Sequence, residues 1–112
     1  MKLLKIVLTI LALSTVVLSQ APTNSWTGTK EISKVEFNEL ENKVIAYDLS
    51  GNTYTYWYDC TYYQCFQGAN TKEDSKKIIA FLLEAKSSGN KVDFYGYQNG
   101  SGFWFNSLRV GE

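Results

Sequence analysis

Aromatic residues are the side chains of this sequence that are best suited to recognition chemistry. The chain contains 17 of them (3 Trp, 8 Tyr and 6 Phe), with seven between residues 54 and 66 and six between residues 94 and 105. An exposed Tyr or Trp ring offers an apolar face and a hydrogen-bonding edge, which suits sugars and equally suits protein interfaces. A domain of this size buries only about 60% of its chain surface. We therefore expect some of these rings to remain exposed and to form a binding surface.

Five tyrosines and two polar residues are the candidate ligand contacts. The alternating tyrosines of residues 54–58 are predicted to form a platform on one strand face, and the two tyrosines between the cysteines to act as stacking rings. Lys30 would pair with an acidic sugar, and Thr29 would add a polar contact. The candidates are Thr29, Lys30, Tyr54, Tyr56, Tyr58, Tyr62 and Tyr63. The competing interpretation is that the rings only fill the core and rims of a barrel.

The residues that enzymes use most often are scarce here. The chain has no histidine, which excludes Ser/His/Asp and Cys/His nucleophile systems and histidine metal sites. Glu36, Glu39 and Glu41 could supply the paired carboxylates of a glycosidase, but they lie on or beside one short strand, the pattern of a solvated face. Two cysteines alone cannot build a four-ligand zinc site. We therefore expect no enzyme activity, no cofactor and no metal.

Charge and the first residues indicate an exported protein that binds no nucleic acid. The formal net charge is +0 and no basic stretch occurs, whereas nucleic-acid binding needs a Lys/Arg footprint. Lys2 and Lys5 precede an apolar run of about a dozen residues that ends in small residues, the pattern of a secretory signal. The run is short of the roughly 20 residues of a membrane span. Residues 1–19 are predicted to be a signal peptide and residues 20–112 one secreted domain, extracellular or periplasmic before assembly; an uncleaved anchor is the alternative.

Export favours a bond between the two cysteines. Exported proteins meet oxidising conditions, so Cys60 and Cys65 are predicted to form a disulfide. The bond would close a loop of four residues and staple the turn that carries Tyr62 and Tyr63. An intermolecular bridge and free thiols remain the alternatives.

The elements that position these residues are strands around one helix. Alternating apolar and β-branched residues predict strands over 31–40, 43–49, 53–60, 91–97 and 103–110. A helix is predicted over 70–88, capped by Asn70 with Glu73 or, in a second register, by Thr71 with Asp74. The order β-β-β-α-β-β predicts a mostly β fold with one helix, a small OB-like Greek-key barrel.

Several short motifs resemble one toxin family. Ser25-Trp26-Thr27-Gly28 is similar to the start of its mature chains, and Glu31-Ile32-Ser33-Lys34-Val35 resembles its first strand. Cys60 falls near a family cysteine at the end of a strand. Phe81-Leu82-Leu83-Glu84-Ala85-Lys86, followed by Gly89-Asn90-Lys91-Val92, resembles the family's helix and next strand. The family is that of the B subunits of AB5 toxins, specifically of subtilase cytotoxin and typhoid toxin.

This resemblance implies an OB-fold protomer that assembles into a ring of five, with the helices lining a central channel. The ring would bind host-cell glycans, often sialylated, and an enzymatic A subunit would dock on it. The chain departs from the family where Thr29-Lys30 leads directly into a strand and where Ser87-Ser88 ends the helix. The family's sialic-acid-binding segment is missing at the first of these two places, so no sialic-acid-binding residue of the family is assigned to this chain.

The sequence thus predicts a secreted, non-catalytic glycan-binding module that acts as a homo-oligomer. The alternative from a different class is a secreted monomeric interaction or inhibitor domain that presents an exposed aromatic face to a protein partner.

Overall fold

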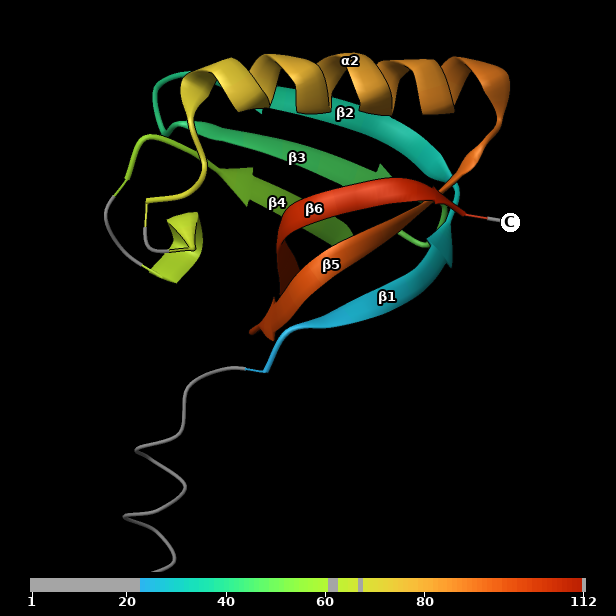
Figure 1. Cartoon of the computed structure of the whole chain (residues 1–112). Coiled ribbons are helices and arrows are strands. Elements are labelled where there is room, and N and C mark those ends of the chain that lie inside the picture. Colours follow the sequence, from blue (N-terminus) through green and yellow to red (C-terminus); the bar gives the residue numbers. More distant parts are fainter. Residues whose placement is uncertain (1–22, 61–62, 67, 112) are drawn as a thin grey trace, which may run out of the picture.

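The chain folds into one curled sheet and one α-helix. The computed structural model describes residues 23–60, 63–66 and 68–111 (Figure 1). Within these ranges the elements are β1 (Ser25–Lys30), β2 (Ile32–Asn38), β3 (Lys43–Asp48), β4 (Thr53–Trp57), the 3-10 helix η1 (Tyr63–Cys65), α2 (Lys72–Ser88), β5 (Lys91–Asn99) and β6 (Gly102–Gly111). The predicted fold class, mostly β with one helix, is confirmed. The predicted signal peptide, residues 1–19, lies outside the described residues.

The strand order makes the sheet an OB-like barrel. The strands lie in the order β1-β5-β6-β4-β3-β2, and β4 and β6 are the parallel pair among antiparallel neighbours. Only Glu31 separates β1 from β2, although these strands stand at opposite ends of that order. The chain itself therefore joins the two ends, so that β1 and β2 act as one long bent strand. A three-strand meander whose first strand is the bent β1–β2, then a helix and a hairpin, form the connectivity of the five-stranded Greek-key OB barrel.

Strand β1 is an element that the sequence pattern did not predict. Its pairing with β5 is irregular between Trp26 and Thr29, and Gly28 has a φ of 87° in that bulge. The Thr27 hydroxyl accepts a hydrogen bond from the Phe94 backbone N (3.2 Å), and the Gly28 N donates to the Asp93 carboxylate (3.0 Å). Side chains therefore replace part of the backbone ladder. The strand has no buried residue, so no apolar alternation marks it in the sequence.

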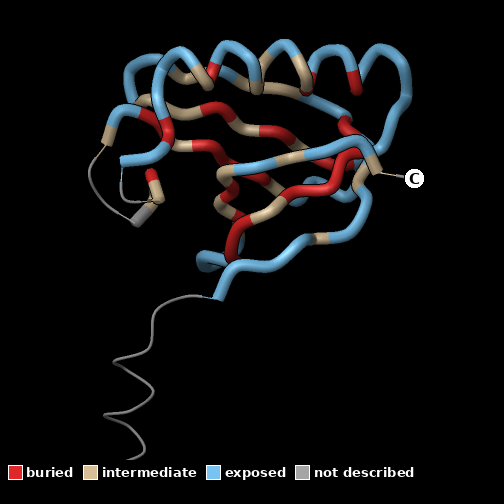
Figure 2. Tube along the Cα trace, in the orientation of Figure 1, coloured by how far each residue is buried: buried red, intermediate tan, exposed pale blue. Residues whose placement is uncertain are grey.

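Aromatic rings fill the barrel. Figure 2 shows the buried residues concentrated on β3, β4, β5 and β6, while the outer side of α2 is exposed. Phe94 stacks on Tyr54 with ring centroids 4.4 Å apart and meets Phe105 edge-on at 4.8 Å. The core-facing side of α2 adds Leu82 and Ala85. Rings thus take the place that smaller aliphatic side chains hold in many cores.

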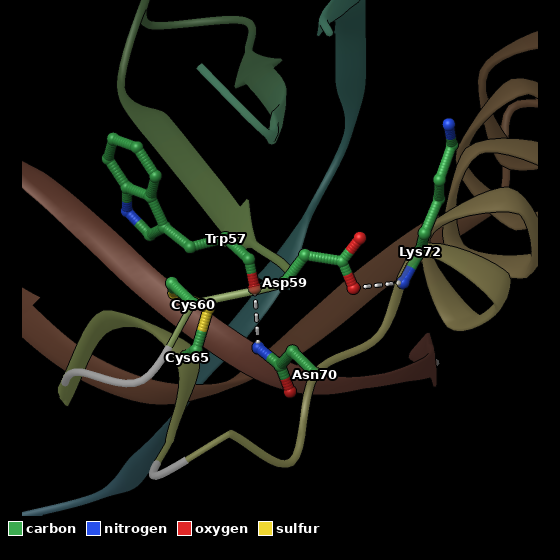
Figure 3. Close-up of a disulfide and its surroundings, with 6 residues drawn as sticks. All are labelled: Trp57, Asp59, Cys60, Cys65, Asn70 and Lys72. Carbon is green, nitrogen blue, oxygen red and sulfur yellow. Dashed lines mark hydrogen bonds between the residues drawn. A yellow bond between two sulfur atoms is a disulfide. The ribbon is translucent and has the colours of Figure 1, made fainter. Parts of the chain in front are cut away.

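Helix α2 begins in the second of the two predicted registers. Thr71 is the N-cap, and its hydroxyl accepts a hydrogen bond from the Asp74 N (3.2 Å). Asn70 instead ties the helix start to β4, because its Nδ2 donates to the Trp57 carbonyl (3.0 Å; Figure 3). The Asp59 carboxylate accepts from the backbone N of Lys72 (3.1 Å). The loop after β4 therefore caps the helix from two directions.

Candidate functional site

A polar pocket lies where β1 meets the start of β4 and the β5–β6 hairpin. Figure 1 shows these segments on the side of the barrel away from α2. The pocket has a volume of about 450 Å³, within the usual range for small-ligand sites. Its lining is mostly hydroxyl and amide side chains with two rings: Thr23, Ser25, Thr27, Lys30, Asn52, Thr53, Tyr54, Gln98, Ser101 and Phe103.

The lining suits a ligand rich in hydroxyl groups. Thr and Ser hydroxyls both donate and accept hydrogen bonds, as do the side-chain amides of Asn52 and Gln98. Lys30 is the charged residue of this lining, so the pocket presents a cation and no carboxylate on its described wall. Tyr54 and Phe103 add only a small apolar surface, because both rings are buried in the barrel. A sugar, especially one with an acidic group, matches this combination.

A buried carboxylate organises the β3–β4 turn beside the pocket. Asp48 is 6% exposed, and it accepts hydrogen bonds from the backbone N of Ser50 (2.9 Å) and of Asn52 (3.0 Å). The Asn52 Nδ2 (3.1 Å) and the Tyr54 hydroxyl (2.7 Å) donate to its other oxygen. Burial alone would raise the pKa of Asp48, but these hydrogen bonds outweigh burial and hold the pKa below its ordinary value. Asp48 is a residue that sequence reasoning missed.

The structure brings two of the seven predicted contacts to the pocket. Lys30 and Tyr54 line it, whereas Thr29 is exposed on β1 and is not part of the lining. Tyr62 lies outside the described residues, and of Tyr63 only its place in η1 is described. That Tyr62 and Tyr63, in the turn closed by the disulfide, form the stacking site for a ligand therefore stays a prediction.

The predicted tyrosine platform on β4 is wrong. Tyr54 and Tyr56 do share one face of β4, and Tyr58 directly follows the strand, but all three side chains are buried in the barrel, at 4%, 2% and 1% exposed. Burial, with a contribution from the Asp74 charge, raises the pKa of Tyr56 to about 12. These side chains are core residues, and only Tyr54 also borders the pocket.

The disulfide is confirmed. Cys60 and Cys65 are bonded, with Cα atoms 5.6 Å apart, so no free cysteine remains among the described residues. Figure 3 shows the bond beside Trp57, Asp59 and the start of α2. The Phe66 ring, next in sequence, contacts the Tyr97 ring with centroids 5.5 Å apart. The disulfide therefore closes the segment from Cys60 to Cys65, and the Phe66 ring that follows it joins this segment to β5.

Two exposed rings lie away from the pocket. Trp26 is 39% exposed and Phe37 is 46% exposed, although neither was among the predicted contacts. The Arg109 guanidinium lies 3.8 Å over the Trp26 ring, and Asp93 holds it through the Nε (3.2 Å) and the Nη2 (3.0 Å). Within the described ranges, seven rings are buried outright: Tyr54, Tyr56, Tyr58, Phe94, Tyr97, Phe103 and Phe105. The other described rings are exposed or only partly buried, as the size argument predicted.

Two of the acidic residues of the glycosidase alternative, Glu36 and Glu41, have neighbours that favour the ionised carboxylate. The Tyr47 hydroxyl donates to Glu36 (3.0 Å), and Lys34 lies 3.3 Å from the same carboxylate. These contacts lower the pKa of Glu36, and Lys43 lowers that of Glu41. A glycosidase acid needs the opposite shift. Among the residues that the structure describes, no group of three His, Cys, Asp or Glu side chains is placed to hold a metal ion.

Comparison of the chain with protein-family models, with curated proteins and with solved structures finds no match. In the described part of the chain, none of the helices has the length and apolar character that crossing a membrane requires.

Proposed function

We propose that this chain is a secreted, non-catalytic glycan-binding module. The observation that carries the proposal is the pocket, whose wall combines hydroxyls, amides, two rings and one lysine. OB barrels bind oligosaccharides through strand faces and adjoining loops, and this pocket is bounded by a strand and two turns. The proposed role is similar to that of the receptor-binding B subunit of an AB5 toxin.

The ligand that fits the pocket best carries a carboxylate. Lys30 would pair with the acid group, because the described wall holds no acidic side chain that could neutralise this lysine. Asn52 and Gln98 would bind hydroxyls. A charge-assisted hydrogen bond contributes about 1.5–3 kcal/mol.

A glycan array tests this proposal. We expect acidic glycans to bind and Lys30→Ala to weaken them by about tenfold or more, the loss of one charge-assisted hydrogen bond. Lys91→Ala, which removes an exposed lysine outside the pocket, is the matched control and should change nothing. Absence of any glycan binding by the wild type, or equal effects of the two variants, would contradict the proposal.

Assembly into a ring of five is part of the same proposal. Exposed aromatic side chains such as Trp26 and Phe37 would then be covered by neighbouring protomers, and an A subunit would dock on the pentamer. Light scattering at low micromolar concentration should give the mass of five protomers. A monomeric mass would contradict the pentamer but would leave the proposed glycan site in place.

The second candidate is a monomeric domain that binds a protein through an aromatic surface. The exposed Trp26 ring with Arg109 stacked on it favours this function, because Trp and Arg are enriched in the energetic centres of interfaces. A monomeric mass together with an array that shows no binding would favour it over the glycan module.

A further inference from the structure

We infer that Asp48 is a positioning residue of the pocket, which orients side chains of the pocket wall. This inference rests on the proposed function. Asp48 is not part of the lining itself, but it receives hydrogen bonds from two residues that are, Asn52 and Tyr54. Both oxygens of its carboxylate are occupied by donors of the β3–β4 turn and β4. Asp48 can therefore affect a ligand only through the side chains of Asn52 and Tyr54.

This arrangement determines which groups the wall offers. One N–H of the Asn52 Nδ2 donates to Asp48 at 3.1 Å, which fixes the orientation of the amide and leaves its oxygen and its second N–H for a ligand. The Tyr54 hydroxyl hydrogen is also directed to Asp48, at 2.7 Å, so this hydroxyl has only acceptor capacity left. Asp48 thus fixes the Asn52 amide in one orientation and turns the Tyr54 hydroxyl into an acceptor, a pattern that suits ligand hydroxyls, which both donate and accept.

The turn geometry depends on the same carboxylate. The Ser50 N and the Asn52 N both donate to Oδ1, and Gly51 between them has a φ of 85°. An asparagine at position 48 would replace one acceptor oxygen by an NH₂ group, which would face donors. The turn and the Asn52 amide would then lose their fixed orientation.

The barrel offers a matched control in its other buried aspartate. Asp93 is also 6% exposed and also accepts from a backbone N and a side chain, those of Gly28 and Arg109. Asp93 is outside the pocket lining. Asp93→Asn should therefore reduce stability as Asp48→Asn does and also loosen β1 at Gly28, but it leaves the hydrogen bonds of Asn52 and Tyr54 to Asp48 in place.

The experiment measures binding of sodium glucuronate and the NMR signals of the Asn52 side-chain amide. We expect Asp48→Asn to weaken glucuronate binding by about tenfold, and Asp93→Asn to leave the Asn52 amide signals as in the wild type. Tyr54→Phe, which keeps the ring and removes one donor, should fold even if Asp48→Asn does not, and should weaken binding by about threefold. The two Asn52 amide protons should differ widely in shift in the wild type and converge in Asp48→Asn.

The outcomes separate the two proposals. Wild-type protein that fails to bind glucuronate contradicts the proposed acidic ligand, and the Asn52 signals then decide the role of Asp48 by themselves. Asn52 amide signals that converge in Asp93→Asn as they do in Asp48→Asn would overturn the inference, since both variants would then act by loosening the barrel. Asn52 amide signals that do not change in Asp48→Asn or, where that variant does not fold, in Tyr54→Phe would also overturn it.

Discussion

At the scale of single residues, Gly96 sets how closely β5 and β6 approach. A Cβ placed on Gly96 would overlap the Trp104 carbonyl oxygen and lie 2.7 Å from the Phe105 Cα, both of them backbone atoms that cannot move aside. The register of β5 against β6 shifts at this point, between Tyr95 and Gly96. The glycine therefore permits the irregular pairing that curls the hairpin.

Gly96→Ala should lower the free energy of unfolding by about 3 kcal/mol, the cost of overpacking a close backbone contact. Gly100→Ala is the control, because Gly100 has a positive φ of 60° but a Cβ added there would meet no atom within 4 Å. Its loss should be about 1 kcal/mol, from backbone strain alone. Urea unfolding measures both, and equal losses would show that the close approach is not the reason for Gly96.

The buried tyrosines predict a delayed alkaline titration. The folded-state pKa of Tyr56 is about 12 and that of Tyr54 is also raised, both mainly by burial, against an ordinary value of 10.0. A raised folded pKa means that these neutral hydroxyls stabilise the fold fully below pH 10, and that this stability is lost as the pH rises through the folded pKa. Phenolate absorbance should therefore show a late phase near pH 12 that Tyr56→Phe diminishes. Titration of all tyrosines together near their ordinary pKa would contradict the burial.

At the scale of elements, α2 depends on its start. The N-cap hydroxyl of Thr71 and the carboxylate of Asp59 each satisfy one backbone N of the first turn, those of Asp74 and Lys72. The helix ends at Gly89, whose φ of 76° suits the left-handed C-cap. The apolar stripe decides that a helix forms here, and the caps decide where it begins and ends.

Thr71→Ala should destabilise the protein by about 1 kcal/mol, the usual value of an N-cap hydroxyl. Thr71→Ser keeps the hydroxyl and should stay close to the wild type. Thermal unfolding followed by helical circular dichroism compares the three proteins. A Thr71→Ala variant as stable as the wild type would mean that the Asp59 contact alone is sufficient.

At the scale of the whole molecule, the barrel is closed by a strand whose hydrogen bonds come partly from side chains. β1 contacts β5 between segments far apart in the sequence, and the Thr27 hydroxyl takes the place of a backbone acceptor for the Phe94 N. This link also shapes one side of the pocket, since Thr27 belongs to its lining. The closure of the fold and the candidate site therefore depend on the same strand.

Thr27→Val keeps the side-chain shape and leaves the Phe94 N without its acceptor, a cost of about 2 kcal/mol. We expect faster hydrogen exchange at the Phe94 amide and at neighbouring β5 amides, while exchange in β3 stays slow. Thr27→Ser should preserve protection. Unchanged exchange in Thr27→Val would show that the hydroxyl has no part in holding β1.

The sequence by itself determined the local elements. Five strands, the helix and its second capping register, and the disulfide follow from alternation, three- and four-residue spacing and cysteine chemistry, which act over a few neighbouring residues. The same information assigned Tyr54, Tyr56 and Tyr58 to one face of β4. Alternation cannot say which face is inside, because that depends on what the sheet packs against.

Only the tertiary structure decided the inside of the barrel, the pairing of β1 and the pocket. The pocket joins residues from position 23 to position 103, and neither Asn52 nor Gln98 carries a local pattern that marks it as part of a site. Gly28 and Asp93 likewise meet across 65 positions. Contacts of this kind arise when the long first strand bends at Glu31 and closes the sheet, a step set by the packing of the whole chain.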